Sequence, residues 1–184
     1  MSTIFLVHGV EGSPEENWFP WLRKELESQG HTVIVPQFPT PKNQTLAAWR
    51  EVLSRYEKDI SRETLFVAHS LGVPFVLHAL ERYPARAAFL VAGFVRPLDI
   101  ELARGTEDFL APFDWETIRS HCEEFFCFHS DDDPYVPPAK AREVAQKLGT
   151  ASTLVPGAGH FHLKSGYDSF PRLLQKMQPV LFSH

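Results

Sequence analysis

The segment 64–72 reads Thr-Leu-Phe-Val-Ala-His-Ser-Leu-Gly, and it constrains the fold more than any other stretch of the chain. Residues 65–67 form an unbroken apolar run, which is typical of a strand covered on both faces of a sheet. The residues that follow Ser70 have the length and composition of a helix. Ala68 and Gly72 flank the serine at two positions on either side. Because a tight turn from strand to helix needs small residues there, the pattern predicts a nucleophile elbow.

Two features weaken this interpretation when the pentapeptide is taken alone. Ala68 stands where the common pattern has glycine, although a methyl group should still allow the turn to close. Serine is also a preferred N-cap residue, so Ser70 could be a simple helix cap. The partners that the rest of the chain offers to Ser70 decide between these two possibilities.

The composition indicates one globular domain that spans residues 1–184. Hydrophobic residues make up 43% of the chain and charged residues 22%. Lys and Arg total 18 against 23 Asp and Glu, and no basic cluster is dense enough for a phosphate backbone, so we expect no nucleic-acid partner. No apolar stretch is long enough to span a membrane, and the first residues do not resemble a signal peptide. We therefore expect no membrane partner and a cytoplasmic location, with Cys122 and Cys127 as buried thiols rather than a disulfide.

Strand-like and helix-like segments alternate through the whole chain. The expected strands are 4–7, 32–35, 65–67, 87–92, 124–129 and 152–155, and the expected helices are 14–29, 46–60, 71–83, 114–121, 139–148 and 170–181. This alternation predicts an α/β fold with a doubly wound, mainly parallel sheet of about six strands. Functional side chains in such a sheet gather at the carboxyl ends of the strands.

One long connection, residues 93–113, has no regular pattern and is a candidate cover for the site. We expect it to offer a shallow apolar patch for substrate, formed by Phe94, Phe109, Phe113 and Trp115. Each buried methylene contributes only about 0.8 kcal/mol, so preference should stop rising when the patch is filled. The predicted acyl preference is therefore for short chains of about two to six carbons.

A nucleophilic serine needs a base on another loop. His160 lies in the glycine-rich turn 156–160, directly after the last expected strand, and is the predicted base. His162, two positions after Gly159, is expected to point elsewhere. His69 and His8 are expected to pack or to support the site rather than to react.

The acid that orients the base should lie between the serine and the histidine, as in hydrolases that run in the order serine, acid, histidine. Asp131, Asp132 and Asp133 follow the expected fifth strand. We favour Asp133, because the Pro-Tyr-Val-Pro that follows it holds the backbone in an extended conformation. Asp131 and Asp132 are then interpreted as solvated loop acids.

The oxyanion formed during acyl transfer needs two backbone N–H donors. The elbow geometry predicts Leu71, the residue after the nucleophile, as one of them. The turn 8–12, His-Gly-Val-Glu-Gly, follows the first expected strand and predicts Val10 as the other. The sequence contains no His-Glu-x-x-His and no Cys-x-x-Cys, so we expect no metal and no cofactor.

Several motifs together resemble one family. Ser70 and Asp133 are 63 residues apart and Asp133 and His160 are 27 apart. The shared motifs are Asn17-Trp18-Phe19-Pro20-Trp21, Asp132-Asp133-Pro134 and Gly159-His160-Phe161. With these, the chain resembles the small α/β-hydrolase family of the retinoblastoma-binding serine hydrolase and its bacterial relatives. The resemblance covers essentially the whole chain and implies a minimal α/β-hydrolase fold without a large cap domain.

The sequence therefore predicts a metal-free serine hydrolase that cleaves small carboxylic esters through an acyl-enzyme on Ser70. A small peptidase or amidase is the alternative enzyme, since both use the same acyl-enzyme chemistry. A hydrolase-fold protein-interaction module with a vestigial serine is the alternative outside enzymes. The family does not settle a substrate, and the resemblance assigns no protein partner to this chain.

Overall fold

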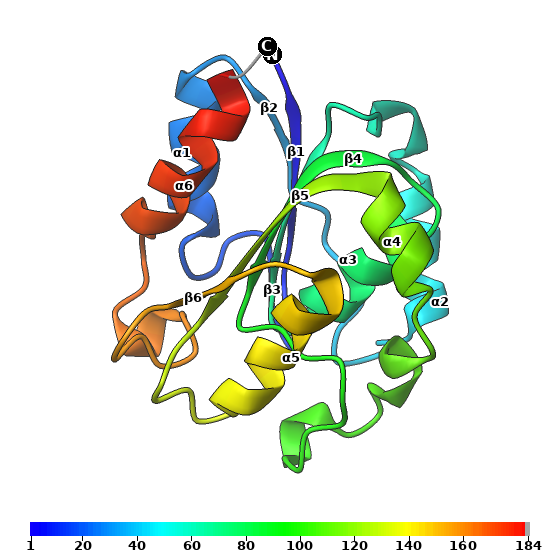
Figure 1. The fold of residues 1–184 in the computed structure, drawn as a ribbon, viewed down its shortest axis with the longest axis vertical. Coiled ribbons are helices and arrows are strands. Elements are labelled where there is room, and N and C mark those ends of the chain that lie inside the picture. The colour runs from blue at the N-terminus through cyan, green and yellow to red at the C-terminus, as the bar shows by residue number, and fades with distance from the viewer. Residues whose placement is uncertain (183–184) are drawn as a thin grey trace.

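A six-stranded parallel sheet forms the centre of the molecule (Figure 1). The computed structural model describes residues 1–182. Its strands are β1 (Thr3–Val7), β2 (Thr32–Ile34), β3 (Leu65–His69), β4 (Ala85–Val91), β5 (Cys122–His129) and β6 (Ser152–Leu154). Their order across the sheet is β2-β1-β3-β4-β5-β6, and every neighbouring pair is parallel. The predicted doubly wound α/β fold is confirmed.

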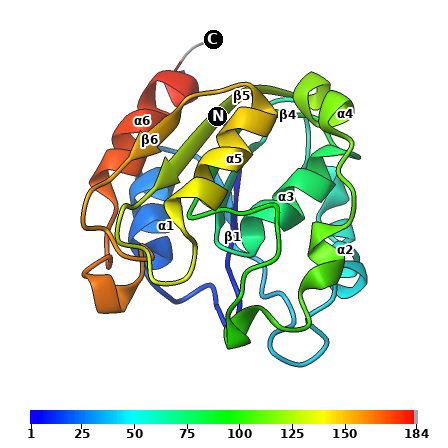
Figure 2. The ribbon, with the colours of Figure 1, turned by 60° about the horizontal axis from the view of Figure 1, so that its bottom comes forward.

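Helices cover both faces of this sheet. They are α1 (Phe19–Ser28), α2 (Leu46–Ser54), α3 (Gly72–Leu80), α4 (Trp115–His121), α5 (Pro138–Leu148) and α6 (Pro171–Phe182), with short 3₁₀ turns η1 (Glu57–Asp59), η2 (Glu101–Ala103), η3 (Glu107–Leu110) and η4 (Leu163–Ser165). Helices α1 and α6 lie on one face, and α2 to α5 lie on the other (Figures 1 and 2). Among residues 1–182, no helix has the length and apolarity needed to cross a membrane.

Alternate residues of each central strand enter two separate hydrophobic cores. In β1, Phe5 and Val7 belong to the core on the side of α2 to α5, whereas Ile4 and Leu6 belong to the core on the side of α1 and α6. All four side chains are fully buried. Successive side chains of a strand point to opposite faces, so a strand covered by helices on both sides needs a continuous apolar run. This explains why the central strands are readable in the sequence.

Two helix boundaries differ from the predicted ones by more than three residues. Helix α1 begins at Phe19 rather than at residue 14, because Asn17 adopts a left-handed backbone conformation (φ +56°) that no helix continues through. The expected helix 46–60 ends at Ser54 and is followed by η1.

Residues 93–113 contain only η2 and η3, so the irregular connection is confirmed and no large cap is present. Cys122 and Cys127 are buried free thiols, as expected.

Candidate active site

Ser70 lies in a tight turn between β3 and α3. Its φ of +55° is in the left-handed region, which a non-glycine residue rarely adopts and which marks a strained position. Its N–H donates to the Val91 carbonyl at the end of β4 (2.9 Å). A Cβ at Gly72 would lie 2.5 Å from the Val7 carbonyl oxygen, so only glycine allows α3 to approach β1 this closely. The elbow predicted from the sequence is therefore present.

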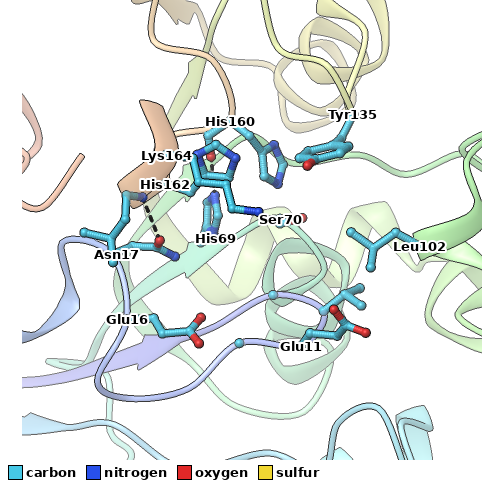
Figure 3. Close-up of a pocket in the computed structure, with 14 residues that line it drawn as sticks. Glu11, Glu16, Asn17, His69, Ser70, Leu102, Tyr135, His160, His162 and Lys164 are labelled. Carbon is cyan, nitrogen blue, oxygen red and sulfur yellow. Dashed lines mark hydrogen bonds between the residues drawn. The ribbon is translucent and has the colours of Figure 1, made fainter. Parts of the chain in front are cut away.

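His160 and Asp133 form a buried pair beside this turn. The His160 Nδ1–H donates to Asp133 Oδ2 (2.8 Å), and the two side chains are only 8% and 2% exposed. Asp133 Oδ1 accepts the N–H groups of Tyr135 (2.9 Å) and Val136 (3.0 Å). With Nδ1 engaged, Nε2 is the ring nitrogen of His160 that remains for chemistry. Ser70 and His160 line the same pocket (Figure 3).

Three side chains that follow β5 hold the backbone of the loop that carries His160. Hydrogen bonds run from the Gly157 N–H to Asp131 Oδ1 (2.8 Å), from the Ala158 N–H to Ser130 Oγ (3.0 Å) and from the Gly159 N–H to Asp132 Oδ1 (2.8 Å). Hydrogen bonds from Ser130 and Gly159 lower the pKa of Asp132. The interpretation of Asp131 and Asp132 as merely solvated acids was therefore incomplete.

The same loop is held from the other side by residues of β3 and of the segment before α1. The hydrogen bonds run from His69 Nε2–H to the His160 carbonyl (2.8 Å), from Trp18 Nε1–H to the Phe161 carbonyl (3.0 Å) and from the Leu163 N–H to Asn17 Oδ1 (3.0 Å). Two of them are drawn in Figure 3. The Asn17-Trp18 motif of the sequence thus positions the histidine loop. His69 supports the site without lining up as a base, as expected.

His69 is neutral under ordinary conditions. Burial, with the nearby His160 as a smaller cause, lowers the pKa of His69 from 6.5 to about 3. The neutral ring of His69 carries one N–H, and this N–H donates to the His160 carbonyl. Because the folded-state pKa is depressed, the unfolded chain binds one more proton than the folded chain between these two values, and stability falls as the pH falls through that window.

Replacing His69 by glutamine is expected to make the fold less sensitive to acid. The glutamine amide retains a donor for the His160 carbonyl but cannot be protonated. In the wild type, the extra proton bound by the unfolded chain changes the unfolding free energy by about 1.4 kcal/mol per pH unit in this window. The variant should lack this contribution. Urea unfolding measured from about pH 4 to 7 checks this. An unchanged slope would show that His69 titrates normally in the folded protein.

His8 fixes the peptide that precedes Val10. Its Nδ1–H donates to the Gly9 carbonyl (2.8 Å), and its Nε2 accepts the Phe38 N–H (3.0 Å). Burial lowers the pKa of His8, which keeps this neutral form. Since the C=O and N–H of a trans peptide point in opposite directions, the Val10 N–H points away from His8. A Cβ at Gly9 would lie 2.9 Å from the Cβ of Ser70, so this turn packs directly against the serine.

Neither the Val10 N–H nor the Leu71 N–H donates to a backbone or side-chain acceptor within residues 1–182. Val10 lines the pocket around Ser70, while the Leu71 side chain is fully buried in the core. The chain therefore presents two unused donors near Ser70, one in the elbow itself and one in the turn after β1.

The pocket around Ser70 has a volume of about 360 Å³. Its polar lining includes Glu11, Glu16, Asn17, His162 and Lys164, and its apolar lining includes Leu102, Tyr135 and Leu163. We expected His162 to point elsewhere. It instead lies in the pocket, with its ring centroid 5.9 Å from that of His160 and its Nδ1 bonded to Ser165 Oγ (2.9 Å). Within residues 1–182, no group of three or more His, Cys, Asp or Glu side chains is arranged to hold a metal ion.

A much smaller apolar recess, of about 20 Å³, adjoins Ser70 and His160. Of the four residues predicted to bind substrate, Phe94 lines this recess. Phe109, Phe113 and Trp115 line neither space. Phe109 packs on Trp49 (centroids 5.0 Å apart), Phe113 stacks on His78 (4.5 Å), and Trp115 packs beside Phe113 (5.0 Å).

The reason for this difference is the path of the connection after η2. Asp108 Oδ2 accepts the Leu46 N–H at the start of α2 (2.6 Å), which ties η3 to that helix. The aromatic side chains of residues 107–115 therefore complete the core over α2 and α3. The recess is formed instead by Leu98, Ile100, Leu102 and Ala103. The spacing of these residues in the sequence matches neither a helix nor a strand, so the sequence does not predict the recess.

Comparisons with known proteins identify the family and support the fold. Residues 4–179 match the family described as serine hydrolase. YdeN of Bacillus subtilis is 32% identical over 172 residues, which cover 91% of this chain and 90% of YdeN. Serine hydrolase RBBP9 of Rattus norvegicus is 28% identical over 165 residues, covering 89% of this chain and 88% of RBBP9.

The crystal structure of the B. subtilis ydeN gene product matches the whole chain at 29% identity, with a TM-score of 0.91 and full coverage of both chains. The resemblance found in the sequence motifs is therefore confirmed. From the family match, the identity with YdeN and the elbow, we conclude that this chain belongs to the serine hydrolase family.

Proposed function

We propose that the protein hydrolyses small carboxylic esters through an acyl-enzyme on Ser70. In this mechanism His160 Nε2 removes the proton from Ser70 Oγ as the oxygen attacks the ester carbonyl carbon. His160 then gives that proton to the leaving alcohol, and the same residue activates the water that hydrolyses the acyl-enzyme. Asp133 holds His160 in the required tautomer and stabilises the imidazolium. No step needs a metal ion or a cofactor.

The observation that carries the proposal is the buried Asp133–His160 hydrogen bond in the pocket of a strained Ser70. A protein that only used this fold for binding would gain nothing from a positive φ at the serine, which costs about 1–3 kcal/mol. The combination therefore favours a reactive serine over a vestigial one. Esters and amides share the same steps, and an amidase remains the alternative enzyme.

The N–H groups of Leu71 and Val10 are the proposed oxyanion donors. Both are unused within residues 1–182. Leu71 follows Ser70 in the elbow, and Val10 lies in the turn after β1 that packs against the serine. Preorganised donors of this kind stabilise the charge that develops in the transition state, because they need no reorganisation when it forms. The N-terminus of α3 follows Leu71 and adds a favourable dipole.

The acyl preference should be for short chains. The recess of about 20 Å³ takes only one or two heavy atoms, since about 10–15 Å³ in this measure holds one water. Each methylene that fits contributes about 0.8 kcal/mol, and further ones contribute nothing. We expect kcat/KM for p-nitrophenyl esters to peak at about two to four acyl carbons and to fall for long chains. A maximum at twelve carbons would mean that the segment 93–106 opens to form a true acyl channel.

Labelling with a fluorophosphonate tests the proposed reactivity directly. An activated serine is phosphonylated, whereas an ordinary hydroxyl is not. We expect one label per chain, located on Ser70 by peptide mass spectrometry, and none after heat denaturation or in Ser70→Ala. A native protein that takes up no label would show that the serine is vestigial.

A further inference from the structure

We propose that the alcohol part of the substrate is polyhydroxylated, so that the enzyme cleaves short acyl esters of sugars or similar polyols. The acyl group would enter the apolar recess, and the alcohol would lie against a polar wall formed by Glu16, Asn17, His162 and Lys164. This inference rests on the proposed function, since it assigns the two halves of an ester to the two spaces beside Ser70.

The sizes of the two spaces separate the halves of the substrate. The recess of about 20 Å³ is lined by Phe94, Leu98 and Ile100, and the pocket of about 360 Å³ opens beside it. Anything larger than a few atoms must therefore occupy the larger pocket. A long alkyl chain there would bury the charged and amide groups of the wall without giving them partners, which is costly.

The polar wall offers both donors and acceptors. Asn17 Oδ1 is taken by the Leu163 N–H, which leaves its amide Nδ2 as a donor, and His162 keeps Nε2 because Nδ1 is bonded to Ser165. Lys164 Nζ offers three donors, and the Glu16 carboxylate accepts. Within residues 1–182, neither the Lys164 ammonium nor the Glu16 carboxylate has a hydrogen bond or ion pair. A hydroxyl donates one hydrogen bond and accepts others, so a polyol can satisfy both kinds of group.

The charges of the wall argue against a strongly charged alcohol. Glu16 and Glu11 would repel an anion, and Lys164 would repel a cation. The exposed Leu163 (54%) and the Tyr135 ring add apolar surface near these polar groups. A sugar ring combines hydroxyls with an apolar face of C–H groups, and this wall has both kinds of surface.

The position of the wall residues relative to His160 determines how the ester is oriented. His162 and Lys164 follow His160 on one loop, and Figure 3 shows them with Asn17 on the side of the pocket opposite Leu102. His160 Nε2 must give its proton to the alcohol oxygen as that oxygen leaves. The alcohol is therefore best placed beside the His160 loop, and the acyl group beside Leu102 and the recess.

Hydrolysis of acetates with different alcohol groups tests the inference. We would measure kcat/KM by titrating released acid for a glucose monoacetate and glycerol monoacetate, against cyclohexyl acetate and butyl acetate of similar size. One or two added hydrogen bonds predict a preference for the polyol esters of about tenfold. Lys164→Ala and Glu16→Ala should each reduce that ratio severalfold. Lys24→Ala, which removes an exposed lysine on α1, is the matched control and should leave the ratio unchanged.

Two results would overturn the inference while the proposed function stands. One is a ratio near one for the wild type although fluorophosphonate still labels Ser70. The other is faster hydrolysis of methyl gluconate than of the polyol acetates, which would place the polar half on the acyl side. Absence of the label would instead remove the proposed function, and this inference with it.

Discussion

The Ser70→Ala variant is expected to lose about a factor of 10⁶ in kcat on a short-chain ester, because nucleophile and base act as a unit. The fold should be retained. Alanine keeps the Cβ that packs against Gly9 and meets the same left-handed φ as serine, so neither strain nor packing changes. Thermal unfolding and initial rates with p-nitrophenyl acetate, at high enzyme concentration, measure the two properties separately.

The His160→Ala variant and the double variant provide the control. Each should be about as inactive as Ser70→Ala, because removing the second member of a unit costs little once the first is gone. His160→Ala also leaves the buried Asp133 Oδ2 without the His160 donor, so the unfolding free energy of this variant should fall, unlike that of Ser70→Ala. More than a few per cent of activity in either single variant, with wild-type contamination excluded, would contradict the assignment.

The fold was predictable because central parallel strands must be apolar on both faces. The run 65–67 and the serine after it fixed the most buried strand and the turn at its end, and β3 and the elbow lie there. The edges of helices were less predictable. The left-handed conformation at Asn17, which helix periodicity does not reveal, shortens α1 at its start.

The predicted substrate patch shows where sequence reasoning stops. An aromatic residue in an irregular connection can pack against the core or face a pocket, and its type does not distinguish the two. Here a hydrogen bond between Asp108 and the start of α2, 62 residues apart, holds η3 against that helix, so that Phe109 is fully buried and Phe113 packs against the same core. Such a contact depends on the assembled fold, and no local pattern announces it.

The support of the His160 loop was only partly visible for a similar reason. The sequence placed Asp131 and Asp132 beside Asp133 and identified the Asn17-Trp18 motif, but not what these residues hold. The structure brings them from segments more than twenty-five residues away onto the backbone of one loop. Side chain to backbone hydrogen bonds across such distances follow from topology, because all these segments meet at the carboxyl edge of the sheet.

Asp133→Asn is expected to lower kcat by about 10⁴, whereas Asp132→Asn should lower it by about tenfold or less. The asparagine carbonyl at position 133 can still accept the N–H groups of Tyr135 and Val136, so the turn should keep its shape. Its amide would then face His160 Nδ1 as a donor and force the ring into the other tautomer. That tautomer carries the proton on Nε2, where it cannot accept the serine proton.

At position 132 the same substitution changes much less. The asparagine carbonyl can still accept the Gly159 N–H and the Ser130 hydroxyl, and the hydrogen bond to the His160 ring is made by Asp133 and not by Asp132. The two variants carry the same substitution at neighbouring residues. They therefore separate the effect of a changed His160 tautomer from the effect of a looser loop. Initial rates across the pH range and thermal unfolding of both variants measure it. If Asp132→Asn instead lowered kcat by about 10⁴, the acid that orients His160 would have to be Asp132.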